Sequence, residues 1–460
     1  MKVYAFKTND FPSNFDVIAT ATLQKTDIAN GNNKFYQIEL HRSGSKYRIY
    51  TCYGRTGTPG KQEERFPSST YEAYAIHDFN LIKAEKTRKG YKEVELAATT
   101  KGTAEGNSKI LSVDVKTDKV QTDSSSVDID PEVSKLVGRL YEEASQGCSQ
   151  QLDGSLKASA ENPLGTLTLT QIKEGEKILQ EANTLLMNNK SYLNSIEKPI
   201  IDISNEFYSM IPQSIPLRPR DQVGRENWQR KYCLNNPEIL DDKFELLKLL
   251  GDVQGVIKGF SSDIGQKYKS MGANLEWVSP LTPEFKAIED QVKNTRSSQH
   301  HWNLKVLNVW RIGVEAQKRE NHRTTMDTIG NVQRLFHGSG NPNILGICSK
   351  GLLKRPPGVY ITGSMFGNGL YFADRSSKSS QYPTSRFSGG NKYQSNFLFL
   401  VDVSLGKIKE YDVAQTYLTN PPAGFDSVMG KAGRSLVNNE YIIYDIRYQE
   451  IKYLIEFKQT

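Results

Sequence analysis

The sequence has few cysteines, and they lie far apart. Its 460 residues include four, Cys52, Cys148, Cys233 and Cys348, and no two of them form a Cys-x-x-Cys pair. Structural zinc sites and small disulfide-rich domains depend on closely spaced cysteines. The spacing therefore excludes both classes, and we expect neither a disulfide framework nor a metal ion.

Long hydrophobic runs are absent as well. The chain has no stretch of about 18 apolar residues, the length that a membrane-spanning helix needs. Its first residues, Met1–Lys7, lack the apolar core of a signal peptide. We expect a soluble intracellular protein that does not enter a membrane, nuclear in a eukaryote and cytoplasmic or nucleoid-associated in a bacterium.

The excess of positive charge is small and is concentrated at the start of the chain. The formal net charge is +7, and residues 1–92 hold fifteen Lys or Arg against nine Asp or Glu. A basic segment joined to a near-neutral remainder suits the binding of a polyanion. An ordinary solvated surface explains the same charge equally well.

The first segment, residues 1–98, has the pattern of a β-rich module with one helix. Residues 34–40 and 47–53 alternate apolar and polar side chains, as half-buried strands do. Residues 70–84 follow with helical spacing. Residues 99–128 are then rich in Thr, Ser, Asp and Lys and nearly free of aromatics, which predicts a flexible linker.

The chain after the predicted linker divides into a helical part and a strand-rich part. Residues 129–262 show apolar positions at helical spacing, which predicts an all-α bundle, with Thr170 as the expected N-cap of one helix. Residues 270–460 contain several alternating runs, which predict a mixed β-sheet domain. The expected fold class is therefore α+β multidomain.

Three short motifs after residue 330 combine residue types that suit one site. They are Leu335–Gly340, with a His beside Gly-Ser, Thr362–Asp374, with a Tyr after a Gly-rich turn, and Asn438–Asp445, with a Glu before an apolar run. A lone His, Tyr or Glu is usually a satisfied core residue or a solvated one. Together the three motifs resemble the catalytic domain of the poly(ADP-ribose) polymerase family, whose reaction breaks the nicotinamide–ribose bond of NAD⁺.

Cleavage of that bond leaves positive charge on the ribose, as in glycoside hydrolysis. A site must therefore hold nicotinamide rigidly and place negative charge where it stabilises the cation. Gly338 can bring bare backbone groups close to a planar carboxamide. Tyr371 and Tyr382 offer ring faces for stacking.

The resemblance assigns roles to individual residues, with NAD⁺ as the substrate and no metal. Glu440 is expected to accept from the nicotinamide-ribose 2′-hydroxyl and to polarise the attacking hydroxyl, with Lys378 beside it. His337 is expected to bond a ribose hydroxyl of the adenosine half. The catalytic residues are thus Glu440, His337, Tyr371 and Lys378, and the NAD⁺-binding residues are His337, Gly338, Ser339, Tyr371, Ser379 and Tyr382.

Two positions depart from the family pattern. Ser364 stands where the family commonly has Tyr, and Leu353 where it often has Arg, although Lys354 and Arg355 are adjacent. Both positions border the loop over NAD⁺, so they bear on affinity and inhibitor response more than on reaction type. Since the family members that elongate ADP-ribose chains carry the Glu, polymer synthesis is the favoured interpretation.

The helical segment resembles the family's regulatory domain. Residues 162–172 and 205–212 fit its two best-marked stretches, and Glu245–Asp252 corresponds to the helix that faces the adenosine pocket. In the family this bundle shields the NAD⁺ site until it opens. A stripe at helical spacing is also what core packing alone requires.

The first segment resembles the WGR domain, with Tyr53-Gly54-Arg55 in place of Trp-Gly-Arg. Tyr53 is expected to stack on a terminal sugar or base, and Arg55 to bind nucleic acid or to bridge to the bundle. Four cations of the following helix are expected to contact phosphates, namely Lys83, Lys86, Arg88 and Lys89.

These resemblances together imply a DNA-break-stimulated enzyme that makes poly(ADP-ribose). Its expected partners are DNA ends or nicks, acceptor proteins including itself, and an accessory factor that redirects acceptor choice. Two alternatives are a mono-ADP-ribosyltransferase on the same scaffold and a DNA-end-binding scaffold with weak catalysis.

Overall fold

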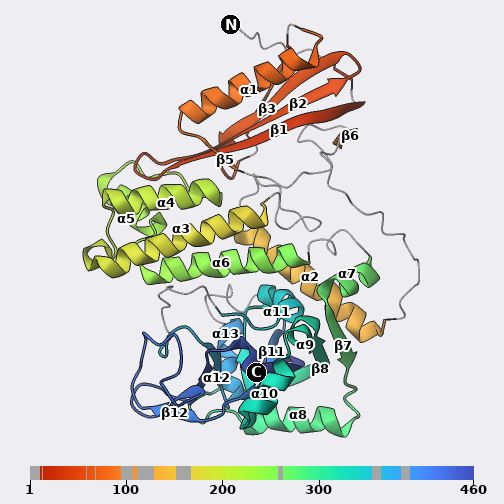
Figure 1. The fold of residues 1–460 in the computed structure, drawn as a ribbon, viewed down its shortest axis with the longest axis vertical. Helices are drawn as coiled ribbons and strands as arrows, with labels where there is room; N and C mark the ends of the chain where they lie inside the picture. Colours follow the sequence, from red (N-terminus) through yellow and green to blue (C-terminus); the bar gives the residue numbers. More distant parts are fainter. Residues whose placement is uncertain are drawn as a thin grey trace. The chain divides into compact units, whose positions relative to one another are not determined.

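The computed structural model divides into two compact units, which Figure 1 colours by position in the sequence. One unit comprises Met1–Ser125 and Ser149–Leu247, and the other comprises Ser126–Cys148 and Lys248–Thr460. The structure describes residues 11–12, 14–58, 60–67, 69–94, 107–110, 129–151, 167–256, 263–354, 364–384 and 394–460.

The first unit begins with an antiparallel sheet covered on one face by helix α1 (Figure 1). Ala75, Phe79 and Ile82 of α1 are buried against a sheet face that includes Leu23 and Ile38. The expected strands and helix are confirmed. The strand order is β4-β3-β2-β1-β5, with β1 Asn14–Asp27, β2 Asn32–Ser43, β3 Lys46–Arg55, β4 Lys61–Arg65, β5 Lys92–Val94 and α1 Glu72–Arg88.

One short strand falls within the expected linker. β6 (Asn107–Ile110) pairs in parallel with β1, next to Asn14–Val17. Backbone pairing with a sheet edge does not require apolar side chains, so this strand can form in a segment of polar composition, and the flexible linker over 99–128 stays a prediction. The rest of 99–128 lies outside the described residues.

Helices complete the first unit. α3 begins at Leu169, and Thr168 caps it by accepting from the backbone N–H of Gln171. The expected cap at Thr170 is wrong, because only Thr168 has a Gln at the third helical position to complete a capping box. The helices are α3 Leu169–Asn188, η2 Lys190–Tyr192, α4 Lys198–Met210, α5 Gln222–Tyr232 and α6 Pro237–Gly255, whose residues to Leu247 belong to this unit.

The second unit contains a five-stranded sheet of order β7-β8-β15-β11-β9. Strand β11 is buried along its whole length, and Phe285, Ile288 and Val292 of α8 pack against this sheet. The strands are β7 Ala273–Trp277, β8 Leu304–Val314, β9 Val332–Gly338, β11 Asn396–Ser404 and β15 Gln449–Gln459.

The second unit also contains a four-stranded sheet of order β10-β14-β13-β12. An isolated β-bridge joins it to the five-stranded sheet. Phe336 of β9 and Ala373 exchange two backbone hydrogen bonds of 2.8 and 3.0 Å. Strands β9, β10 and β14 therefore follow one another in space. The four strands are β10 Leu370–Phe372, β12 Ile408–Tyr411, β13 Ser427–Gly430 and β14 Glu440–Ile443.

The second unit also contains helices, most of them short. They are α2 Pro131–Gln151, whose part up to Cys148 belongs to this unit, α7 Ile264–Met271, α8 Pro283–Asn294, α9 Glu315–Arg319, α10 His322–Ile329, η4 Asn341–Asn343, α11 Ile344–Lys350, α12 Ser376–Ser379, α13 Gln381–Thr384 and η6 Ile446–Tyr448. Among the helices that the structure describes, none combines the length and the apolar content needed to cross a membrane. All four cysteines are buried, and no disulfide joins them.

Candidate active site

Three neighbouring strands carry the three motif residues. His337 lies on β9, Tyr371 on β10, and Glu440 opens β14. β10 and β14 are antiparallel, with Tyr371 opposite Ile442, so Glu440 lies two residues further along the same strand. The Phe336–Ala373 contact brings β9 alongside. Residues that are more than 100 positions apart in sequence are thereby brought to one place.

The ring of His337 has a fixed orientation. Its Nδ1 lies 2.9 Å from the backbone oxygen of Tyr371. Because a carbonyl oxygen only accepts, Nδ1 is the nitrogen that carries the proton, and Nε2 of the neutral ring is an acceptor. His337 is therefore set up to accept from a hydroxyl group such as that of a ribose.

Tyr371 contributes a rigid ring rather than an acid. Its hydroxyl donates to the backbone oxygen of Gly367 at 2.8 Å and accepts from the N–H of Phe366 at 3.0 Å. Burial raises the pKa of Tyr371, and Ser364 bonds its hydroxyl. The departure at Ser364 thus lies directly beside the ring that is expected to stack on nicotinamide.

The position of Gly338 accepts no side chain. A Cβ added there would lie 2.0 Å from the backbone oxygen of Ser379. Ser379 is buried, and its hydroxyl donates to the backbone oxygen of Phe336 at 3.1 Å. This leaves the Ser379 oxygen able to accept from an amide. Gly338 and Ser379 are thus in close contact, and this contact is possible only because residue 338 has no side chain.

Glu440 forms a largely buried ion pair. Its Oε1 lies 2.8 Å from Nζ of Lys378, and the two side chains are 8% and 21% exposed. Burial acts to lower the pKa of Lys378, but interactions with Tyr382 and Glu440 outweigh it and hold that pKa above its ordinary value. Lys378 is thus a charged partner that fixes the carboxylate of Glu440.

The remaining expected residues lie around this centre. Ser339 accepts from the side-chain amide of Asn343 at 3.4 Å, and Tyr382 is 48% exposed on α13. Leu353 is partly exposed, and Nζ of Lys354 donates to the backbone oxygen of Tyr444. Arg355 lies outside the described residues.

Family profiles match the chain in three consecutive ranges. A WGR domain profile matches residues 19–98, a poly(ADP-ribose) polymerase regulatory domain profile matches 128–270, and a poly(ADP-ribose) polymerase catalytic domain profile matches 282–435. The chain belongs to the poly(ADP-ribose) polymerase family. Because the catalytic match ends before Glu440, the placement of that residue depends on the strand geometry described above.

Curated members of the family match along most of the chain. "Poly [ADP-ribose] polymerase 1" of Xenopus laevis is 28% identical over 495 residues, which cover 96% of this chain and 46% of the frog protein. "Protein mono-ADP-ribosyltransferase PARP3" of Mus musculus is 27% identical and covered to 76%, and this match spans 89% of the chain. "Poly [ADP-ribose] polymerase 2" of Arabidopsis thaliana is 26% identical over 96% of the chain and is covered to 73%. The chain thus spans about half the length of the frog relative.

Arg55 of the WGR domain contacts the helical segment. Its guanidinium donates to the backbone oxygens of Gly31, Ile215 and Pro216 at 3.1, 2.7 and 2.8 Å. These contacts favour the bridging role over nucleic-acid binding. Tyr53 stacks on a neighbouring tyrosine at 5.2 Å, and its hydroxyl donates to an acidic side chain at 2.6 Å; its partners are Tyr36 and Glu63.

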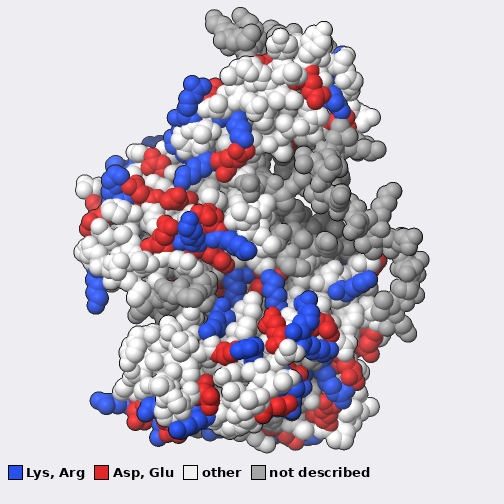
Figure 2. Space-filling model, viewed as in Figure 1, with Lys and Arg blue, Asp and Glu red and all other residues white. Residues whose placement is uncertain are grey.

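The cations of α1 are largely balanced by nearby carboxylates. Lys83 pairs with Glu93 at 2.6 Å, and Lys89 pairs with Glu85 at 2.5 Å. Lys86 lies over the ring of Tyr36, and Arg88 is exposed on the same helix. On the face shown in Figure 2, basic and acidic side chains are interspersed. The role of these residues in nucleic-acid binding stays a prediction.

The end of the regulatory domain touches the segment that follows the His337 motif. Nζ of Lys350 donates to the backbone oxygen of Gly251 at 2.6 Å and lies 3.3 Å from Oδ1 of Asp252. A Cβ at Gly346 would lie 2.3 Å from Asp252. The end of α6 thus packs closely on α11, and the expectation that Glu245–Asp252 faces the adenosine pocket stays a prediction.

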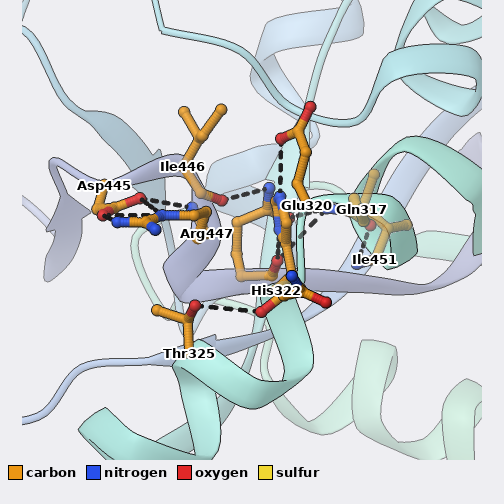
Figure 3. Close-up of polar contacts among 10 residues, drawn as sticks. Gln317, Glu320, His322, Thr325, Asp445, Ile446, Arg447 and Ile451 are labelled. Carbon is orange, nitrogen blue, oxygen red and sulfur yellow. Dashed lines mark hydrogen bonds and ion pairs between the residues drawn. The ribbon is translucent and has the colours of Figure 1, made fainter.

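His322 shows what a structural histidine looks like in the same domain. It is buried, with Nδ1 2.7 Å from the backbone oxygen of Gln449 and Nε2 3.3 Å from Glu320 (Figure 3). Gln317 joins the same group by donating to the Gln449 side chain at 2.9 Å. These contacts fix α9 and α10 on β15, and the imidazole has no part in the candidate site.

Sequence reasoning did not find the residues that hold Lys378 in place. These residues are Ser297, His300 and Trp302. They hydrogen-bond Ser377 and Ser380, which lie about 80 positions later in the sequence. The sequence offers one signal, a run of serines on both sides of Lys378. The run alone does not indicate a structural role, because serines are usually exposed, whereas these serines are buried.

Proposed function

We propose that this chain is an NAD⁺ ADP-ribosyltransferase that releases nicotinamide. The observation that carries the proposal is the buried pair of Glu440, on the strand next to that of Tyr371, and Lys378, on α12. A fixed carboxylate in a site of low exposure stabilises developing positive charge much more than it would in water.

Each part of NAD⁺ has residues of suitable chemistry. The polar groups of Gly338 and Ser379 hold the carboxamide of nicotinamide, and the ring stacks on Tyr371, with Tyr382 on the exposed side. Nε2 of His337 accepts from a hydroxyl of the adenosine ribose, and Ser339 assists. The close approach of Ser379 to Gly338, which a Cβ at position 338 would prevent, supports this arrangement.

The reaction then follows from charge and geometry. The bond between C1′ of the ribose and the nicotinamide nitrogen breaks, and its electron pair leaves with nicotinamide. Glu440 accepts a hydrogen bond from the 2′-hydroxyl and stabilises the cation at C1′. The acceptor oxygen attacks C1′, and Glu440 polarises the attacking hydroxyl and takes up its proton as the new C1′–O bond forms.

The acceptor is proposed to be a protein side chain, including those of this chain, and then the growing ADP-ribose chain. Glu440 supports elongation because the same carboxylate can orient a ribose hydroxyl as the nucleophile. A mono-ADP-ribosyltransferase is the second candidate. It is favoured by the match of the mouse protein named for that activity over 89% of the chain.

DNA breaks are proposed as the stimulus, read by the WGR domain. The contact of Arg55 with Ile215 and Pro216 supports this idea, since it links the WGR sheet to the helical segment. An accessory protein that redirects acceptor choice belongs to the same proposal. The third candidate is a DNA-end-binding scaffold with weak catalysis.

Incubation with labelled NAD⁺, with and without a nicked or blunt-ended duplex, tests these candidates on one sizing gel. We expect a DNA-dependent ladder of products. A single short band would select mono-ADP-ribosylation, and a ladder that is independent of DNA would remove the sensor role. Binding of DNA without label transfer would leave only the scaffold.

A further inference from the structure

The helix α12 carries Lys378 and Ser379, yet it cannot hold its own position. It contains four residues, and no side chain caps its N-terminus. A single helical turn is unstable in water unless other parts of the fold stabilise it. The placement of Lys378 against Glu440 therefore depends on what surrounds α12.

Buried serine hydroxyls supply part of that support. Ser376 donates to the backbone oxygen of Val292, at the end of α8, at 2.6 Å. Ser379 donates to the backbone oxygen of Phe336, on β9, at 3.1 Å. The two ends of α12 are thus attached to different elements, and the Ser379 end is the one beside Gly338.

The segment after α8 supplies the rest. Trp302 Nε1 donates to Ser380 Oγ at 3.3 Å. Ser377 Oγ accepts from the backbone N–H of Ser297 at 2.8 Å and lies 2.8 Å from Nδ1 of His300. A hydroxyl has one hydrogen and two acceptor sites, so Ser377 can bond Nδ1 in either tautomer of the neutral ring. His300 also stacks on Trp302 at 4.4 Å.

The surroundings of His300 favour a neutral ring. Burial lowers the pKa of His300, and the positive charge of Lys378 and the neighbouring His301 lower it further. The side-chain amide of Gln381 lies 3.4 Å from Nε2. A neutral ring has no charge to repel Lys378, whereas a protonated ring would repel its positive charge.

We propose that His300 is a positioning residue that acts through Ser377 to hold Lys378 against Glu440. The inference depends on the proposed function, because Glu440 matters only if it serves the transfer reaction. Ser379 is attached separately to β9, so the position proposed to hold nicotinamide does not depend on His300. Loosening His300 should therefore slow the Glu440-dependent step and leave NAD⁺ binding nearly intact.

Two substitutions separate this role from a general loss of fold. His300→Ala removes the imidazole that bonds Ser377. It should lower kcat by about 10-fold to 100-fold, the size of effect that a small displacement of a catalytic group produces, with little change in KM for NAD⁺. His300→Asn puts Oδ1 near the place of Nδ1 and should restore most of the rate. His301→Ala is the matched control, since His301 is exposed, and its rate should not change.

The pH profile gives a readout that a merely structural residue would not move. The rate of the unaltered protein should fall as the pH drops through the lowered pKa of His300, because the protonated ring repels Lys378. In His300→Asn this acid limb should disappear. Equal rates for the Asn and Ala variants, or an unchanged acid limb in the Asn variant, would overturn the proposal.

A measurement without turnover keeps the two proposals distinguishable. The ring of His300 can be titrated by NMR in the unaltered protein and in Ser377→Ala. Loss of the hydrogen bond between Ser377 and the ring should shift the pKa of His300 in the variant. An unchanged titration would overturn the positioning role, whereas absence of any ADP-ribosyl transfer by the unaltered protein would overturn the proposed function.

Discussion

The candidate active site and the helix α1 both carry charged residues that stand out in the sequence. The two regions differ in how far these charges are exposed to solvent. Glu440 and Lys378 face each other with little exposure, whereas Lys89 and Glu85 pair on an open helix surface with side chains 60% and 48% exposed. Removing one partner of a buried pair leaves an uncompensated charge, while exposed pairs contribute about 0–1 kcal/mol. Position in the fold therefore decides how much a given charge matters.

The largest effect should come from Glu440→Gln. The variant removes the negative charge that stabilises the ribose cation, so we expect ADP-ribosyl transfer to fall by about 100-fold or more, with polymer lost and some NAD⁺ cleavage retained. Initial rates with labelled NAD⁺ measure the transfer, and nicotinamide release measures the cleavage.

A matched control for this variant lies in the same sheet. Glu410 on β12 pairs with Lys431 at 3.2 Å, and both side chains are about half exposed. Glu410→Gln should leave both rates unchanged. Undiminished polymer from the Glu440→Gln protein would remove Glu440 from the mechanism, and equal losses in both variants would point to a general effect of charge.

An intermediate effect is expected from Arg55→Ala. Three backbone oxygens lose a charged donor, so the free energy of unfolding should fall by roughly 1–3 kcal/mol. Stimulation by DNA should fall more than affinity for DNA, because the lost contacts join the WGR sheet to Ile215 and Pro216. Chemical denaturation, a DNA-binding titration and the transfer assay measure the three quantities.

Arg42→Ala is the control for that substitution. Arg42 lies on the same sheet, but its partners are the exposed carboxylates of Asp16 and Glu72. Its loss should alter stability and stimulation little. If Arg55→Ala instead weakens DNA binding and stimulation to the same extent, Arg55 belongs to the nucleic-acid interface.

Much of the catalytic domain could be predicted because its signals are local. The strands around His337 and Glu440 and the turn before Tyr371 each lie within a few consecutive residues. The error at Thr170 was also local, since two threonines compete and the Gln at position 171 decides between them. Short-range physics is visible in a sequence, even where it misleads by two residues.

The rest could not be predicted because it depends on distant pairs. Arg55 bonds residues 160 and 161 positions away, and His300 meets Ser377 across 77 positions. The contact of Phe336 with Ala373 likewise joins two sheets. A single sequence contains no pattern that specifies such partners. It therefore does not decide whether Arg55 binds nucleic acid or bridges to the bundle, and it does not identify His300.

The smallest effects should come from α1. Glu85→Gln removes the acidic partner of Lys89 and should raise DNA affinity slightly, whereas Lys89→Ala should lower it and reduce the salt dependence of binding by about one unit of slope. Both variants should change the free energy of unfolding by about 0.5 kcal/mol or less, as exposed i, i+4 pairs do. Binding titrations over a series of salt concentrations measure the slope. Equal affinity for both variants and the unaltered protein would place the DNA contact away from this end of α1, and a large loss of stability would show that the pair is structural after all.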